Sequence, residues 1–176
     1  VESGAQLIIG PGTELQGYRG RSIVARGRLA VLGTESKPVR MSQHPSASWR
    51  WGGLIIENGT PAGYTDPITL DYRSGTLISH AVIEEATAGN NYAVRSSDPA
   101  TYVLDSDVRS IAAQELVIDT STVHRSVNAA QRLRANRTVF SGHDSWVGGP
   151  RFEIVDSMIG TVSGWTYLSG NGRIVG

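Results

Sequence analysis

Three aspartates are the residues of this chain best placed to do chemistry. Asp105 and Asp107 lie two positions apart beside one short apolar run, and Asp119 follows the next run. Glycoside hydrolysis requires two carboxyls about 5 to 10 Å apart, and a row of carboxylates is also a candidate ligand set for calcium. We therefore name Asp105, Asp107 and Asp119 as candidate catalytic residues. The sequence calls for no cofactor and leaves calcium binding open.

The same aspartates belong to a recurring series of polar residues, which gives them a second interpretation. Each member follows a short apolar run, and the series comprises His80, Asp105, Asp119, Asn136, Asp156 and Asn171. Polar side chains of this kind commonly satisfy backbone donors in tight bends. We expect the series to stack at one corner of successive layers, and this backbone role is the interpretation that the sequence favours.

Aromatic residues supply the other candidate site. A tryptophan face combines apolar area with a polar edge, so Trp49 and Trp146 are candidates for carbohydrate binding. Trp51 and Trp146 each stand beside paired glycines, and residues in that position can instead cover a corner or an end of the fold. We favour this structural role for Trp51.

The histidines give no sign of a metal site. His44, His80 and His124 are scattered without metal-ligand spacing, so we expect surface or corner residues. The run His143-Asp144-Ser145 contains the residue types of a nucleophilic triad. Adjacent residues of an extended strand point to opposite sides, so these three cannot form one.

Composition limits both the fold and the partners. The 176 residues fit one domain, and 16 basic side chains balance 16 acidic ones, so no net field favours nucleic acid or anionic membrane. No apolar run approaches the roughly 20 residues of a membrane span. Twenty-one glycines and only two phenylalanines are typical of a β protein with frequent turns. The absence of cysteine excludes thiolate catalysis and Cys-ligated zinc.

A repeat runs through the C-terminal half. Short apolar runs meet a small polar residue, and an aliphatic residue returns three positions later, or four positions later at Val123. Ala112–Leu116 recurs as Ala129–Leu133, seventeen residues on, which carries Asp119 onto Asn136. Uneven repeat lengths with a constant local pattern indicate a solenoid of strands, because turns lengthen outward while strands still stack. Helix starts at the two Ala-Ala-Gln stretches remain the alternative.

The N-terminal half predicts short strands by alternation. Apolar residues two apart predict one buried side in each strand, at Leu7/Ile9, Leu29/Val31, Val39/Met41 and Leu54/Ile56. Glycine-rich turns separate these strands, at Gly10–Gly12, Gly17–Gly20, Gly33–Thr34 and Gly52–Gly53. The segment Asn58–Asp66 is predicted to leave the regular stack.

Four of these N-terminal stretches carry a family resemblance. Leu7–Leu15, Ser22–Leu29, Leu32–Met41 and Trp51–Leu54 together resemble the opening coils of secreted bacterial parallel β-helix proteins of the pectate-lyase-like superfamily. The resemblance implies an all-β, right-handed parallel β-helix, a solenoid of about eight or nine coils, as a single domain over residues 1–176. A left-handed hexapeptide helix is the alternative, but its six-residue aliphatic beat is missing.

The resemblance also sets expectations for function. Pectin-degrading relatives have paired aspartates, a Gly-His-Gly and an Arg-Ile-Lys motif, whereas Ser141–Asp144 and Gly172–Val175 match these motifs incompletely. Fold kinship alone does not assign an activity. We therefore expect a non-enzymatic structural or adhesive scaffold, located extracellularly or at the cell surface. The alternative is a polysaccharide-active or carbohydrate-binding β-helix of the cell-surface or phage tailspike type.

The ends of the stack set the expected partners. The repeat pattern runs to Gly176, and no amphipathic capping segment is evident. We expect either a longer stack or docking on other copies of the chain, end to end, into a fibre. Polysaccharide is the second expected partner, while neither nucleic acid nor membrane insertion is expected.

Overall fold

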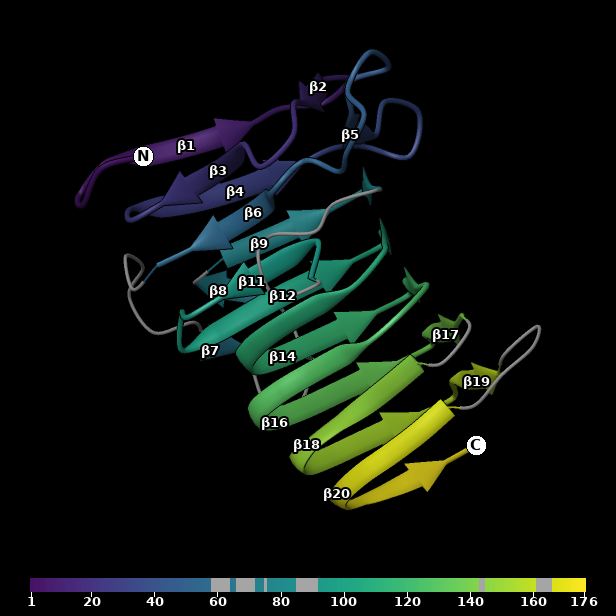
Figure 1. Cartoon of the computed structure of the whole chain (residues 1–176). Coiled ribbons are helices and arrows are strands. Elements are labelled where there is room, and N and C mark those ends of the chain that lie inside the picture. Colours follow the sequence, from purple (N-terminus) through teal and green to yellow (C-terminus); the bar gives the residue numbers. More distant parts are fainter. Residues whose placement is uncertain (58–63, 66–71, 75, 85–91, 143–144, 161–165) are drawn as a thin grey trace.

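The computed structural model (Figure 1) describes residues 1–57, 64–65, 72–74, 76–84, 92–142, 145–160 and 166–176. These residues form strands, turns and irregular segments, with no helix among them, so the all-β prediction is confirmed. No helix of the described residues could therefore cross a membrane. The predicted loop Asn58–Asp66 and the run His143-Asp144-Ser145 lie largely outside the described residues.

Two parallel sheets contain nearly all the strands. The eleven-stranded sheet contains β1 (Gln6–Ile9), β3 (Ser22–Ala25), β4 (Arg28–Leu32), β6 (Gly53–Ile56), β9 (Thr76–Ser79), β11 (Val94–Ser96), β12 (Ala100–Leu104), β14 (Ile111–Asp119), β16 (Val127–Asn136), β18 (Ser145–Val155) and β20 (Thr166–Val175). The seven-stranded sheet contains β2 (Glu14–Gly17), β5 (Val39–Gln43), β10 (Ala81–Ile83), β13 (Asp107–Val108), β15 (Thr122–Val123), β17 (Val139–Ser141) and β19 (Met158–Gly160). A separate antiparallel pair joins β7 (Tyr64–Thr65) and β8 (Tyr72–Ser74).

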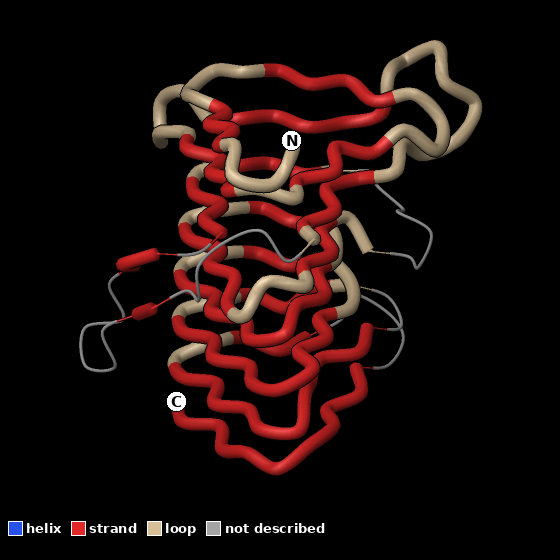
Figure 2. Tube along the Cα trace, turned by 90° about the vertical axis from the view of Figure 1, so that its left-hand side faces the viewer, coloured by secondary structure: helices blue, strands red, loops and turns tan. Residues whose placement is uncertain are grey.

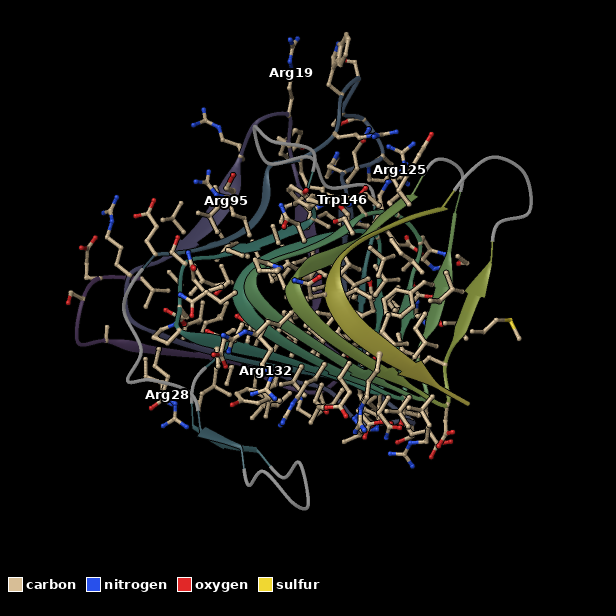
Figure 3. The ribbon with its side chains drawn as sticks, turned by 90° about the horizontal axis from the view of Figure 1, so that it is seen from below. Arg19, Arg28, Arg95, Arg125, Arg132 and Trp146 are labelled. Carbon is tan, nitrogen blue, oxygen red and sulfur yellow. The ribbon has the colours of Figure 1, made fainter. Side chains whose placement is uncertain are left out.

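The long strands bend, so the larger sheet has two flanks. The start of β14 pairs with β11, whereas its last five residues pair with β12. The strands β16, β18 and β20 repeat this path, each pairing with the one before it along both arms. Figure 3 shows the bent strands end-on, and Figure 2 shows their layers following one another from the N-terminal end of the molecule.

The core is a column of aliphatic side chains stacked between the sheets. One inward ladder crosses eight layers in register: Ile9, Val31, Ile78, Val103, Ile118, Ala135, Ile154 and Ile174. The first seven are buried, whereas Ile174 on the last strand is 53% exposed. Each buried Val or Ile contributes about 1.5–3 kcal/mol by leaving water, so every layer is stabilised by the layers above and below it.

The alternation predicted for the N-terminal strands is confirmed. Seven of those eight apolar residues are buried and Leu7 packs against the core as a half-buried side chain. The predicted match of the two Ala-Ala-Gln stretches is also confirmed, because Leu116 pairs with Leu133 and Asp119 pairs with Asn136. Both stretches are strand, so the helical alternative is wrong. An irregularity after Ala113 places the bend of β14 against that of β16.

Candidate functional site

Five sharp corners, each between the larger and the smaller sheet, organise the polar residues. Each corner residue has a left-handed φ of 45–48°, and the five are His80, Asp105, Thr120, Arg137 and Asp156. Non-glycine residues seldom adopt this conformation, which costs about 1–2 kcal/mol. Each corner N–H donates to a carbonyl of the following layer, at Leu104, Asp119, Asn136, Val155 and Val175. The strained corners are therefore stacked and hydrogen-bonded from layer to layer.

Hydroxyl side chains follow four of these corners, each by one residue, and form a ladder. Ser106, Ser121, Thr138 and Ser157 each donate to the carbonyl two residues earlier, at 2.7–2.9 Å. Ser106 Oγ also accepts the N–H of Ala81, and Ser121 Oγ accepts the N–H of Ser106, both at 3.1 Å. This hydroxyl ladder does the backbone work that the sequence assigned to the Asp and Asn series.

The predicted polar series is correct at three corners and shifted elsewhere. His80, Asp105 and Asp156 occupy corners as expected, but Asp119 and Asn136 end their strands one residue before the corner. Asn171 pairs with Arg151 along β20, away from any corner. The strands β14 and β16 each run one residue further than expected, to Asp119 and Asn136, before the corners at Thr120 and Arg137. Val123 therefore follows Asp119 by four residues instead of three. The recurrence of Ser or Thr after four of the five corners was the signal that would have corrected the register.

The three candidate aspartates occupy different surroundings. Asp105 at its corner and Asp107 on β13 both line an open groove of about 520 Å³ on the outer side of the seven-stranded sheet. Asp119 instead accepts two hydrogen bonds from Arg137, at 2.6 and 3.1 Å, and one from Asn136 at 3.1 Å. The hydrogen bond from Arg137 to Asp119 raises the pKa of the guanidinium, and the charges of Asp105 and Asp156 act in the same direction. The negative charge of Asp119 is thus balanced by the guanidinium of Arg137, while Asp105 and Asp107 face the groove.

Asp107 is the first member of a hydrogen-bonded chain that the sequence did not predict. Its Oδ1 lies 2.7 Å from Nε2 of His124, and Nδ1 of His124 lies 3.2 Å from the hydroxyl of Ser141. The side chains are partly exposed, 48% for His124 and 43% for Asp107. A second groove, of about 310 Å³, lies beside them and is lined by Ile83, Glu84, Asp107, Arg109 and His124.

Strand register explains why these three residues meet. Val108, Val123 and Phe140 pair in consecutive strands of the seven-stranded sheet and point inward. Asp107 precedes the first of them, whereas His124 and Ser141 follow the second and third, so all three side chains stand on the outer side. Asp107 pairs with Thr122, so His124 lies two positions further along its strand and is reached diagonally, whereas His124 and Ser141 directly follow the paired residues Val123 and Phe140. The 17-residue layer was a signal for the second contact only, and the local sequence around each residue carried none.

The candidate tryptophans lie apart. Trp49 precedes β6, is 62% exposed, and has the guanidinium of Arg19 about 5.0 Å from its ring. Trp146 belongs to β18, several strands further along the same flank, where its Nε1 donates to Ser169 at 2.7 Å. Figure 3 shows Trp146 and Arg19 in the end-on view. The two tryptophans therefore do not form one platform.

Trp51 has the structural role predicted for it. It is 2% exposed, its Nε1 donates to the carbonyl of Glu84 at 3.0 Å, and its ring lies against Gly17. A methyl group at Gly17 would stand 2.6 Å from Cβ of Trp51. The indole therefore fixes the turn after β2 to the layers below.

An ion-paired cluster occupies the outer side of the last two layers. Glu153 accepts hydrogen bonds from Nε and Nη2 of Arg173, and Arg134 lies 3.7 Å from its other oxygen. The hydrogen bond from Arg173 is the main cause that lowers the pKa of Glu153. This cluster is a pairing of charges along β16, β18 and β20 rather than a site with an open groove.

The outer face is polar and carries the two grooves above, a third of about 120 Å³ over β2 and β5, and one hydrogen-bonded Asp-His-Ser chain. Among the described residues, no group of three His, Asp or Glu side chains could hold a metal ion. Comparison with protein-family models, curated protein sequences and solved structures finds no match. The function is therefore argued from the residues of this chain.

Proposed function

We propose that the chain is a right-handed parallel β-helix of the pectate-lyase-like type that serves as an extracellular or cell-surface scaffold. The observation that supports the fold is the inward ladder from Ile9 to Ile174, whose eight members fall in eight layers. That number agrees with the eight or nine coils expected from the sequence. Right-handed winding follows from the strong preference of parallel crossover connections for that hand.

The scaffold role rests on the exposed outer edge of β20. Leu168 and Ile174 continue inward rows that are buried in the preceding layer, yet they are 44% and 53% exposed here. Among the strands that the structure describes, β20 pairs with β18 alone, so its other edge offers unpaired donors and acceptors to them. A further strand laid on β20 would cover both features at once. We propose that a second copy of the chain supplies it, which yields end-to-end assembly and a structural or adhesive fibre.

The opposite end of the stack is partly covered. The amino group of Val1 donates to the carbonyl of Val24 at 2.8 Å, and the N–H of Arg26 donates to Val1 at the same distance. Val1 therefore lies against β3, while β1 and β2 each pair on one side only. End-to-end assembly would use these two edges together with β20.

Sedimentation velocity of the 176-residue chain over a concentration series tests assembly. We expect concentration-dependent association of the unchanged chain, lost in Ile174→Glu, which places a charge in the inward row. Tyr167→Glu is the matched control, because Tyr167 is also exposed but pairs with Trp146 on the outer side of the same strand. A chain that stays monomeric at every concentration, or equal behaviour of the two variants, would overturn the proposal.

Carbohydrate binding is the second candidate function, and the outer face of the seven-stranded sheet supports it. Three grooves there share lining residues: Val82 lines two of them, Glu84 lines two, and Asp107 lines two. They form a polar track across β2, β5, β10, β13 and β15, of a kind that a saccharide chain can occupy. The carboxyls of Asp105 and Asp107 face this track.

A glycan array and a reducing-sugar assay, each with and without calcium, test this candidate. Binding that is lost in Asp105→Ala but kept in Asp156→Ala would support the track, because Asp156 occupies an equivalent corner outside the grooves described here. Turnover abolished by Asp105→Ala would rank the polysaccharide-active function above the scaffold. No retained glycan and no released sugar would remove the second candidate.

A further inference from the structure

The Asp107-His124-Ser141 chain carries an inference that the scaffold proposal does not contain and does not need. The three residues lie on β13, directly after β15, and at the end of β17. Figure 1 labels β17, one layer from the C-terminal β19. Their positions depend only on the pairing of these three strands, so the site does not require assembly or a saccharide partner.

The two hydrogen bonds fit one tautomer of the neutral His124 ring. Asp107 is an acceptor as a carboxylate, so the 2.7 Å contact to Nε2 of His124 places a proton on Nε2. Nδ1 then carries a lone pair and accepts the hydroxyl proton of Ser141 across 3.2 Å. This is the tautomer in which both bonds form, and it leaves His124 ready to take the serine proton.

We propose that Ser141 is the nucleophile of an acyl-transfer site, with His124 as its general base and Asp107 as the residue that positions His124. Nucleophile, base and orienting carboxylate lie within hydrogen-bond reach in that order, which is the arrangement that activates a serine hydroxyl. Gly142 follows Ser141 with a φ of 145°, in the region that favours glycine, so the backbone changes course at once after the nucleophile.

The reaction balances with an ester and water as the only co-reactants. Ser141 Oγ bonds to the ester carbonyl carbon while its proton moves to Nδ1 of His124. The carbon–oxygen bond to the alcohol breaks, and the alcohol leaves with the proton from Nδ1. Water then attacks the acyl-serine, gives a proton to Nδ1, and releases the carboxylic acid and the free serine, to which the proton returns.

The neighbouring groove indicates the class of ester. Of its five lining residues only Ile83 is apolar, and its side chain is fully buried. The polar lining residues are Glu84, Arg109, Asp107 and His124, whereas Ser141 is not a lining residue and adjoins the groove through its contact with His124. Among the described residues, this groove has no apolar tunnel for a long acyl chain. Esters of a short acyl group with a polar alcohol fit this lining, whereas long-chain lipid esters do not.

Reaction with a fluorophosphonate probe, followed by peptide mass spectrometry, tests the nucleophile directly. We expect modification at Ser141 in the unchanged chain and none in Ser141→Ala. Ser42→Ala is the matched control, because Ser42 occupies the same outer row on β5. Modification spread over several serines, or none at Ser141, would overturn the proposal.

Hydrolysis of 4-nitrophenyl acetate, compared with 4-nitrophenyl palmitate, tests the relay and the substrate class. Ser141→Ala and His124→Gln should each lower the acetate rate about 100-fold or to background, whereas Ser42→Ala should not change it. A rate that survives Ser141→Ala would show that His124 or another group reacts directly, and the proposal would be wrong. A faster palmitate reaction would overturn the substrate class.

The positioning role of Asp107 has a spectroscopic signature. In ¹⁵N-resolved imidazole spectra, His124 should be the Nε2–H tautomer in the unchanged chain, with the resonance assigned by its loss in His124→Gln. Asp107→Asn should shift that tautomer and slow the acetate reaction while the thermal midpoint of unfolding stays unchanged. An unchanged tautomer and rate in Asp107→Asn would contradict the role.

Discussion

The two halves of the molecule build the same kind of layer by different means. In the C-terminal half, β14, β16, β18 and β20 are continuous strands of 9 to 11 residues that bend from one flank to the other. In the N-terminal half, the corresponding flanks are separate strands of four or five residues, such as β3 and β4, which are joined by Arg26 and Gly27. Layer lengths vary in both halves, but register partners such as Leu116 and Leu133 in the C-terminal half lie closer in the chain than Val31 and Ile78 in the N-terminal half.

This difference determines where outer side chains can cooperate. In the C-terminal half, His124 and Ser141 follow the paired residues Val123 and Phe140, and Asp107, which pairs with Thr122, reaches His124 diagonally. In the N-terminal half, β5 and its neighbour β10 start 42 residues apart in the chain. The C-terminal half carries the Asp107-His124-Ser141 chain, whereas the N-terminal half has the Tyr18-His44-Ser46 contacts at its surface and the buried side chain of Trp51.

The largest loss of stability is expected at Gly17, where the turn after β2 meets the buried side chain of Trp51. Gly17→Ala should destabilise the chain by about 1–3 kcal/mol, because the new methyl group would stand 2.6 Å from Cβ of the buried Trp51. Gly10→Ala is the control, since nothing lies within 4 Å of its added Cβ. Urea unfolding measures both variants. Equal stability of the two would show that Trp51 is not held as described.

In the C-terminal half, the hydroxyl ladder is the feature whose loss should lower stability most. Ser121→Ala should cost about 1–2 kcal/mol, because the buried N–H of Ser106 loses its acceptor. Ser121→Thr should keep most of the stability, since Thr138 holds the same place in the next layer. Urea midpoints compare the two variants, and a harmless Ser121→Ala would remove the ladder from the account.

A substitution at a corner should raise the stability of the folded chain rather than lower it. Thr120 is β-branched at a φ of 48°, whereas asparagine tolerates this conformation, so Thr120→Asn should stabilise the chain by about 0.5–1 kcal/mol. Thr122→Asn, in β15 of the same layer, should destabilise it slightly because asparagine is unfavourable in strands. Thermal midpoints of the pair measure the difference. A destabilising Thr120→Asn would show that the corner is not strained.

The smallest expected effect is on the stability of the folded chain at acid pH. Arg173 lowers the pKa of Glu153 in the folded chain below its ordinary value, so the unfolded chain takes up this proton first as the pH falls. The stabilisation is therefore complete above the ordinary glutamate pKa and is lost as the pH falls toward the lowered one. For this partly exposed pair we expect about 0.5 kcal/mol. Glu153→Gln should flatten the pH dependence of urea unfolding by that amount, and an unchanged slope would contradict the pairing.

Sequence reasoning could predict the inward side of the molecule and missed part of the outward side. Alternation at Leu29/Val31 or Leu54/Ile56 reports burial directly, because burial depends on each residue's own polarity. The meeting of Asp107, His124 and Ser141 depends on layer length, which local patterns do not reveal. The internal match that pairs Leu116 with Leu133 contained the layer length that brings Ser141 beside His124, but not the shorter layer that sets β13 against β15.

The corners were misplaced for a related reason. Asp119 and Asn136 resemble turn residues, yet the left-handed positions are occupied by Thr120 and Arg137, residue types that seldom adopt this conformation. The corner is fixed by stacked backbone hydrogen bonds and by the hydroxyl that follows, at Ser121 and Thr138. Backbone hydrogen bonds to the neighbouring layers therefore outweigh the conformational preferences of the individual corner residues.

Register between layers is the claim on which the scaffold, the corners and the relay all depend, and cysteine pairing measures it most directly. The chain has no cysteine, and Thr122 pairs with Val139 on the outer side, while Met158 lies one layer further. The double variant Thr122→Cys/Val139→Cys should oxidise to an intramolecular disulfide, and Thr122→Cys/Met158→Cys, two strand spacings apart, should not. Failure of the first pair, or oxidation of the second pair in its place, would contradict the stacking described here.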